Sequence, residues 1–216
     1  KHRRQLTHGS TRRDETRSRA AMAILFISDL HLHAERPQQT RALLRLLDTA
    51  ARLGDRLFIL GDLFEYWLGD DDDAPPHDVV TDALGRYAAN GGEAAIMHGN
   101  RDFLIASAFC ERTGCTQLPD PCALALGEQR ALLMHGDLLC TRDTDYQALR
   151  RTVRDPAWQA DMLARPLEER RALARQLRDT SCAETGGKAE AIMDVDQGTV
   201  ERYMRDHDCR LLIHGH

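Results

Sequence analysis

The sequence predicts an α/β fold, in which short buried strands alternate with helices. Ala23–Ile27 is a continuous apolar run of the length expected for a buried parallel strand. Gln38–Leu53 places its leucines and alanines at helical spacing. Two further apolar runs flank Gly127 and Glu128, which is the pattern of an antiparallel hairpin. Together these observations predict an α/β sheet with an antiparallel part.

The remaining elements follow from the same two periodicities. Short apolar runs predict strands at Ala23–Ile27, Arg56–Leu60, Ala94–Met97, Cys122–Leu126, Arg130–Met134 and Arg210–Ile213. Longer segments with helical spacing predict helices at Gln38–Leu53, Asp78–Ala89, Leu104–Arg112 and Gln197–Arg205. A chain of 216 residues is long enough for one substantial core, so we expect one domain that carries an insertion.

The stretch Asp143–Arg178 breaks the alternation because it contains no predicted strand. It is compatible with helix throughout and is divided by Pro156 and Pro166. Apolar residues recur along it at Tyr146, Leu149, Val153, Trp158, Met162, Leu163, Leu167, Leu173 and Leu177. We therefore expect a helical cap over about residues 141–190, inserted between two strands of the main sheet.

Charge and composition limit the possible partners. Residues 1–21 hold seven basic and two acidic side chains, a net charge of +5, and show no apolar periodicity. We expect a disordered basic tail there. The whole chain carries −5, so residues 22–216 carry −10, which disfavours a nucleic-acid partner. The six cysteines form no C-x-x-C pair, which is typical of reduced thiols in a cytosolic protein. No apolar run approaches the ~20 residues that span a bilayer, so membrane contact would be peripheral.

Five polar blocks each follow a predicted strand directly. They are Asp29-Leu30-His31, Gly61-Asp62, Gly99-Asn100-Arg101-Asp102, His135-Gly136-Asp137 and Gly215-His216. Because ligands of open α/β sheets gather outside the carboxyl ends of the strands, we expect these side chains to meet. Carboxylate, imidazole and amide ligands without thiolate suit Mn²⁺, Fe, Co, Ni or Zn. A carboxylate such as Asp62 can bridge two ions that activate a water for attack on phosphorus, so the pattern indicates a two-metal phosphoesterase site.

The series of blocks resembles the calcineurin-like metallophosphoesterase superfamily. That resemblance implies a sandwich of mixed β-sheets flanked by helices, here with the helical cap. Most members place histidine after the asparagine of the third block, whereas this chain has Arg101, which cannot act as a general acid. Within the superfamily, the chain from Met22 to His216 is similar to the UDP-2,3-diacylglucosamine diphosphatases of lipid A biosynthesis. The stretches that carry the similarity are Ile24–Leu32, Gly61–Glu65, His98–Leu104, Met134–Cys140 and Ile192–Val195.

The resemblance implies two Mn²⁺ ions and a set of site residues. The implied metal ligands are Asp29 and His31 for the first ion, Asp62 as the bridge, and Asn100, His135 and His216 for the second. The residues implied to act in catalysis are Asp62, Asn100, Arg101 and His135. The residues implied to bind substrate are Asn100, Arg101, Asp143, Ser181, Thr185, Lys188 and His216. We expect Asp102 and Asp137 to orient their neighbours instead of binding metal.

The last superfamily block is Gly-His-x-His, and Gly215-His216 matches its first half. The final histidine would lie past the end of this chain. We therefore expect a C-terminally truncated fold, an incomplete first metal site and impaired activity for residues 1–216 as printed.

The implied reaction is Mn²⁺-dependent hydrolysis of the pyrophosphate bond of UDP-2,3-diacylglucosamine. Water would attack the α-phosphorus and give UMP and 2,3-diacylglucosamine 1-phosphate, with the acyl chains held by the cap. The implied location is the cytoplasmic face of the inner membrane, with the protein bound peripherally and with no nucleic acid and no obligate protein partner. Two alternatives stay open, another calcineurin-like phosphodiesterase and an inactive metal-binding scaffold.

Some polar residues are expected to have no part in the site. We expect the run Asp70–Asp73 to be a solvated loop. We expect the isolated histidines to lie on the surface, namely His2, His8, His33, His77 and His207.

Overall fold

The computed structural model describes residues 23–53, 55–185 and 194–216. The predicted basic tail, Lys188 and the first two residues of Ile192–Val195 lie outside these residues. Ser181 and Thr185 fall on a helix of which the backbone is described but not their side chains.

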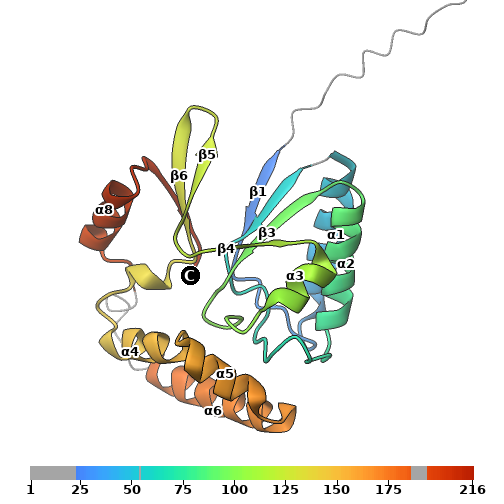
Figure 1. Ribbon diagram of the computed structural model, residues 1–216, viewed down its shortest axis with the longest axis vertical. Helices are drawn as coiled ribbons and strands as arrows, with labels where there is room; N and C mark the ends of the chain where they lie inside the picture. Colours follow the sequence, from blue (N-terminus) through green and yellow to red (C-terminus); the bar gives the residue numbers. More distant parts are fainter. Residues whose placement is uncertain (1–22, 54, 186–193) are drawn as a thin grey trace, which may run out of the picture.

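A four-stranded parallel sheet forms the first layer of the fold. Its strands are β1 (Ile24–Ile27), β2 (Arg56–Ile59), β3 (Glu93–Met97) and β4 (Thr116–Leu118), in the order β1-β2-β3-β4. The helices α1 (Pro37–Leu53), α2 (His77–Ala89) and α3 (Ser107–Thr113) cover its outer face (Figure 1). Each crossover from strand to helix to strand returns in parallel, so the carboxyl ends of the strands share one edge.

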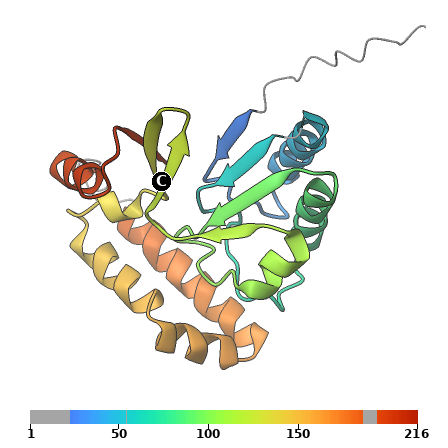
Figure 2. The same ribbon diagram turned by 45° about the horizontal axis from the view of Figure 1, so that its top comes forward.

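The predicted antiparallel hairpin is present, and it belongs to a second sheet of three strands. Strands β5 (Cys122–Leu126) and β6 (Gln129–Met134) pair antiparallel, and β7 (Leu211–His214) joins β6 in parallel. The two faces of β6 pack against different layers, which explains why the two sheets lie face to face and do not merge. Ala131 and Leu133 pack toward the first sheet, whereas Leu132 and Met134 pack under α8 (Gln197–Asp206). The result is the sandwich of two sheets between helical layers that the family resemblance implied (Figure 2).

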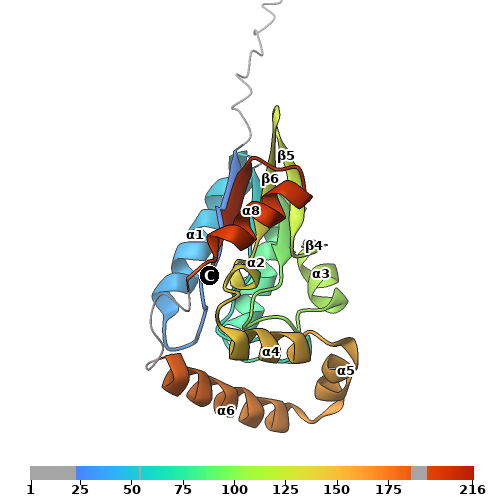
Figure 3. The same cartoon turned by 90° about the vertical axis from the view of Figure 1, so that its left-hand side faces the viewer.

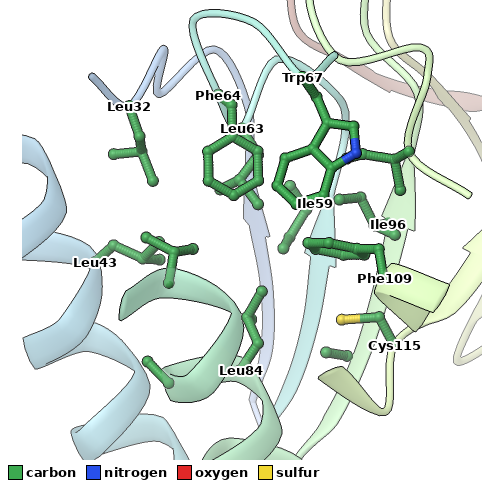
Figure 4. Packing of buried hydrophobic residues seen from close by; sticks show 14 of the residues in the cluster. Leu32, Leu43, Ile59, Leu63, Phe64, Trp67, Leu84, Ile96, Phe109 and Cys115 are labelled. Carbon is green, nitrogen blue, oxygen red and sulfur yellow. The ribbon is translucent and has the colours of Figure 1, made fainter. Parts of the chain in front are cut away.

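The larger core lies between the first sheet and its helices. Leu43 and Leu84 from the helices face Ile59 and Ile96 from the strands, and all four are at most 3% exposed (Figure 4). Burial of such aliphatic side chains contributes about 1.5–3 kcal/mol each. This core holds the strands rigidly, and the loops at their ends carry the polar blocks.

Strand β4 was missed by the sequence analysis. It has only three residues, Thr116 and Gln117 are exposed, and the strand pairs on one side only. A three-residue edge strand gives no apolar alternation to detect. The other predicted elements are present, with shifts of one to three residues at their ends.

Among the described residues between β6 and β7, three cap helices precede α8 and lie beneath the ends of both sheets (Figure 3). They are α4 (Thr144–Val153), α5 (Pro156–Ala164) and α6 (Leu167–Thr185), preceded by the 3₁₀ turn η1 (Asp137–Leu139). Pro156 opens α5 behind Asp155, whose carboxylate accepts the N–H groups of Ala157 and Trp158. The helices therefore link two strands of the second sheet, which corrects the expectation that they interrupt the main sheet.

No helix among the described residues is long and apolar enough to cross a bilayer. The cysteines Cys110, Cys115, Cys122, Cys140 and Cys209 are free thiols.

His77 and Asp72 are buried, which corrects two surface expectations. The His77 ring is 4% exposed and packs against Phe64 and Trp67, at centroid distances of 4.8 and 4.7 Å. Asp72 is 3% exposed and accepts a hydrogen bond from Arg171 of the cap at 2.8 Å. The segment that holds both residues therefore contacts the core and the cap. The expectation was wrong because isolated histidines and acidic runs usually face solvent.

The buried His77 is expected to weaken the fold at acidic pH. Burial lowers its pKa below the ordinary value of 6.5, so below about pH 6.5 the unfolded chain binds a proton that the folded chain excludes. Its contribution to stability is complete above that pH and is lost as the pH falls. Urea unfolding at pH 7.5 and at pH 5 gives the loss of unfolding free energy between the two pH values. This loss should be smaller in His77→Gln than in the wild type. An unchanged difference would contradict this role.

Candidate metal centre

The predicted ligands follow strands of both sheets. Asp29 and His31 follow β1, Asp62 follows β2 and Asn100 follows β3. From the second sheet, His135 follows β6 and His216 follows β7. The marked C-terminus lies between the two sheets on the side of the cap (Figures 1 and 2). The convergence predicted from the sequence is therefore present in the fold.

Four of the six predicted ligands have a left-handed backbone conformation. The φ angles are 54° at Asp29, 45° at His31, 52° at Asp62 and 61° at His216. Among the described non-glycine residues only Asp208 shares this conformation. Such conformations cost free energy and persist where the surroundings hold them, which is common at functional sites. Here they turn the chain sharply at each strand end and aim the side chains inward.

Glycines allow the loops to approach one another closely. A Cβ atom at Gly99 would overlap the backbone N and a carboxylate oxygen of Asp62. A Cβ atom at Gly61 would lie 2.7 Å from Nδ1 of His135. Because real Cβ contacts are not this short, crowding at the site requires glycine at both positions, and at Gly61 the φ of 89° favours glycine as well.

The side chains form two clusters that overlap at Asp29. Asp29, His31 and Asp62 offer ligand atoms within 4.8 Å of one another, and so do Asp29, His135 and His216. One Asp62 oxygen lies 3.7 Å from Nε2 of His31 and the other lies 3.9 Å from Nε2 of His135. The Asp62 carboxylate thus faces one histidine of each cluster, as a bridging ligand must.

The position of Asp29 differs from the predicted division of ligands. Its carboxylate takes part in both clusters, and Oδ2 accepts the N–H of His216 at 2.9 Å. Asn100 belongs with His135, because its Oδ1 lies 3.0 Å from Nε2 of that ring. The predicted residues therefore come together, with Asp29 at the boundary between the two halves.

The donor set fits a pair of divalent cations. Burial raises the pKa of Asp62 to about 7, with the nearby Asp102 adding to the effect, so its ionised form is disfavoured in the metal-free site and a bound cation would stabilise it. Nδ1 of His135 donates to the carbonyl of Leu60 at 2.9 Å, which leaves Nε2 for a metal. Burial lowers the pKa of His31, whose Nδ1 is buried without a hydrogen-bond partner, and the neutral ring can coordinate.

Two buried carboxylates orient the loops, as expected. Asp102 accepts the N–H groups of Leu63 and Gly99 at 2.8 Å and that of Asp62 at 3.3 Å. Asp137 is fully buried and accepts from Arg150 at 2.7 Å. Asp102 uses both oxygens for these hydrogen bonds, whereas Asp137 uses Oδ2 and its buried Oδ1 has no hydrogen-bond partner.

The structure also places the predicted substrate residues. The backbone N–H of Arg101 donates to Asp62 at 2.8 Å, and its buried Nε has no hydrogen-bond partner. Asp143 is 9% exposed and caps α4 by accepting the N–H of Tyr146 at 3.1 Å. Its contact with substrate stays a prediction, as do those of the side chains of Ser181 and Thr185.

A pair of residues around His31 was missed. Glu65 Oε2 lies 4.0 Å from Nδ1 of His31 and pairs with Arg36, which also donates to the His31 carbonyl at 2.9 Å. A carboxylate beside a ligating imidazole commonly fixes the orientation of the ring. Glu65 lies within the Gly61–Glu65 block, which was a usable signal, whereas nothing in the sequence marks Arg36.

An apolar cavity extends from the metal centre under the cap. Asn100 and Arg101 contribute to its lining, and the rest comes from core and cap residues that include Trp67, Phe103, Leu149, Val153, Trp158 and Met162. Part of the predicted apolar stripe of the cap thus lines a cavity beside the polar cluster.

Comparisons with known proteins identify the family of the chain. The family model described as calcineurin-like phosphoesterase matches residues 22–216. A protein of Pseudomonas paraeruginosa is 52% identical over 196 residues, which cover 90% of this chain and 81% of that protein. Proteins of Chromohalobacter salexigens (49% identical) and Aeromonas hydrophila (47% identical) match over 195 residues, which cover 90% of this chain and 79% and 81% of their own lengths.

All three relatives bear the name UDP-2,3-diacylglucosamine hydrolase. The match of the family model spans nearly the whole described fold and includes every strand that carries a predicted ligand. The family and the hydrolase class expected from the sequence are therefore confirmed: the chain belongs to the calcineurin-like phosphoesterases, metal-binding hydrolases.

Proposed function

We propose that this protein hydrolyses the pyrophosphate bond of UDP-2,3-diacylglucosamine in a reaction that depends on Mn²⁺. Water attacks the α-phosphorus, and the products are UMP and 2,3-diacylglucosamine 1-phosphate. The observation that carries the proposal is the junction at Asn100 and Arg101, where a polar metal-ligand cluster meets an apolar cavity. A substrate with a pyrophosphate at one end and acyl chains at the other matches that junction, and the names of the relatives support it.

The six clustered side chains would hold the two ions: Asp29, His31, Asp62, Asn100, His135 and His216. When bound, such a pair polarises a phosphoryl group and lowers the pKa of a bound water. The chain itself supplies Arg101, whose buried Nε is unpaired and can bind a phosphoryl oxygen. A guanidinium stays protonated, so it stabilises charge and does not transfer a proton. Because the leaving group is a phosphate monoester, which is stable as an anion, a strong general acid is unnecessary.

The cavity is suited to acyl chains. Its lining includes Trp67, Phe103, Leu104, Val153, Trp158 and Met162, which would bury methylene groups at about 0.8 kcal/mol each. Because the substrate carries two acyl chains, we place the reaction at the cytoplasmic face of the inner membrane, with the protein bound peripherally.

Filling the cavity is expected to weaken binding of the diacylated substrate. Ala174 of α6 lines the cavity, whereas Ala172 of the same helix is exposed. Ala174→Trp should raise KM for UDP-2,3-diacylglucosamine at least about tenfold, since several methylene contacts would be lost. It should leave hydrolysis of the small diester bis(p-nitrophenyl) phosphate unchanged. Ala172→Trp is the matched control, and an equal effect of both variants on KM would contradict the proposed acyl site.

The whole proposal is tested by release of UMP from UDP-2,3-diacylglucosamine in ¹⁸O-labelled water. We expect release that requires Mn²⁺ and stops with a chelator, and we expect the label in UMP, because attack occurs at the α-phosphorus. The assay is run on the 216-residue chain and on a chain extended past His216 through the predicted Gly-His-x-His block. Label in the sugar phosphate would refute the site of attack. Activity on simple diesters without UMP release would favour another phosphodiesterase.

A further inference from the structure

One cap helix is hydrogen-bonded to the loops that carry two of the three predicted ligands of the second ion, Asn100 and His135. Arg154, at the C-terminal end of α4, donates from Nη2 to the carbonyl of Gly99 at 2.8 Å. That carbonyl belongs to the peptide group that leads into Asn100. One turn earlier, Arg150 donates from Nε to Asp137 at 2.7 Å, two residues beyond His135. The helix thus contacts the loop after β3 and the loop after β6 with two side chains four residues apart.

Arg150 is also linked to the His135 backbone through Asp120. Nη2 of Arg150 lies 3.2 Å from Oδ2 of Asp120, and Oδ1 of Asp120 accepts the N–H of His135 at 3.3 Å. The Tyr146 hydroxyl, also on α4, donates to Asp137 at 2.6 Å. The Arg150 guanidinium therefore binds Asp137, two residues beyond His135, and also Asp120, which accepts the His135 N–H.

These groups are buried, so their geometry is restricted. Side-chain exposure is 0% for Asp137, 7% for Asp120 and 14% for Arg150. Charged groups at such depth are stable only with good hydrogen-bond geometry, and loss of one partner leaves the other charge uncompensated. Arg154 is fixed further by the ring of Phe103, which lies 5.7 Å from its guanidinium carbon. The arginines have little freedom to move relative to the loops.

The same helix lines the apolar cavity. Leu149, Arg150, Val153 and Arg154 all contribute to its wall. The helix that would contact the substrate therefore also holds the peptide before Asn100 and the loop around His135.

We propose that Arg150 and Arg154 are positioning residues, which keep Asn100 and His135 in place for the second metal ion. Neither guanidinium belongs to the ligand clusters. Each acts through a neighbour, Arg154 through the Gly99 carbonyl and Arg150 through Asp137 and Asp120. The inference rests on the metal centre of the proposed function and not on the identity of the substrate.

The test compares variants of α4 in the full chain with Mn²⁺ alone as the probe. Calorimetric titration of metal-free protein measures each Mn²⁺ binding step, and thermal unfolding of metal-free protein measures the fold. Hydrolysis of bis(p-nitrophenyl) phosphate separates kcat from KM. The variants are Arg154→Met, Arg150→Met and Arg154→Lys. Arg151→Met is the matched control, because Arg151 is an exposed arginine of the same helix.

We expect Arg154→Met and Arg150→Met to weaken one of two Mn²⁺ binding steps about 10–100-fold, as residues that orient metal ligands typically do. We expect kcat on the small diester to fall while KM stays within about twofold. A lysine can still donate to the Gly99 carbonyl, so Arg154→Lys should recover most of the lost affinity. Arg151→Met should match the wild type in every measurement.

Wild-type Mn²⁺ affinities in folded Arg154→Met would overturn the inference, as would an equal loss in Arg151→Met. If Arg154→Met does not fold, the inference is tested by Arg154→Lys. Failure of Arg154→Lys to fold, or to bind both ions, would show that Arg154 has a general structural role instead. Failure of the proposed substrate is distinguishable, because a wild type that binds Mn²⁺ and cleaves the diester without releasing UMP leaves this inference intact.

Discussion

Replacing Asp62 with alanine is expected to abolish turnover, with kcat lowered roughly a thousandfold or more. The reason is its position, because its two oxygens face His31 at 3.7 Å and His135 at 3.9 Å. Loss of this carboxylate would loosen both ions at once. The check is UMP release at saturating Mn²⁺, together with the metal content of the dialysed protein. Two ions retained per chain with near-normal kcat would contradict the bridging role.

The same carboxylate is expected to destabilise the metal-free protein at neutral and alkaline pH. Burial, together with the nearby Asp102, raises the pKa of Asp62 from 3.8 to about 7. Between these values the folded chain holds a proton that the unfolded chain releases, so stability falls as the pH rises from about 4 to about 7. Asp62→Asn has no such ionisation and should be more stable than the wild type at pH 8 by on the order of a few kcal/mol. Urea unfolding in chelator at pH 8 and pH 4.5 measures this, and the advantage should shrink at the lower pH.

Gly99→Ala is expected to damage the fold and the metal centre together. The added Cβ would overlap the backbone N and a carboxylate oxygen of Asp62 and lie 2.7 Å from its Cγ. The neighbouring atoms include backbone, which cannot move aside, and overpacking of this kind costs about 1–3 kcal/mol. Displacement of Asp62 should lower kcat on the order of a hundredfold, since misplacement by about 1 Å has effects of that size. Chemical unfolding and UMP release measure the two losses.

The matched control for that variant is Gly198→Ala. Gly198 lies on α8, and a Cβ there would meet Asp196 at 3.4 Å, an ordinary contact. We expect a gain of about 0.5–1 kcal/mol from helix propensity and no change in kcat. Equal losses in the two variants would show that the crowding around Asp62 does not explain the effect of Gly99→Ala.

Much of the fold was predictable because apolar residues recur with different spacing in its strands and its helices. Continuous apolar runs such as Arg56–Leu60 and the helical spacing of Gln38–Leu53 are local properties of the chain, and both predictions match the structure closely. The second sheet was not predictable from such patterns. Whether the hairpin around Gly127 joins the first sheet or opens another depends on which face of β6 meets Phe58 and Met97, and strand pairing over long distances leaves no local signal.

Some polar residues could likewise be placed from local sequence, and others could not. Asp62 and Asn100 could be predicted because each directly follows a strand and belongs to a recognisable block. His77 was predicted to be exposed because burial of a lone histidine depends on the packing of Phe64 and Trp67 around it. Arg154 carries no signal, since its partner is a backbone carbonyl 55 positions away in the chain.

The sequence by itself determined which elements form and which side chains stand at the strand ends, because these depend on apolar period and on residue type within short segments. Only the tertiary structure decided that Asp29 lies between both ligand clusters, that the cap adjoins the metal centre through Arg150 and Arg154, and that an apolar cavity lies beside it. The physical reason is that hydrogen bonds and burial between distant segments depend on how whole sheets and helices pack, and that packing is a property of the entire chain.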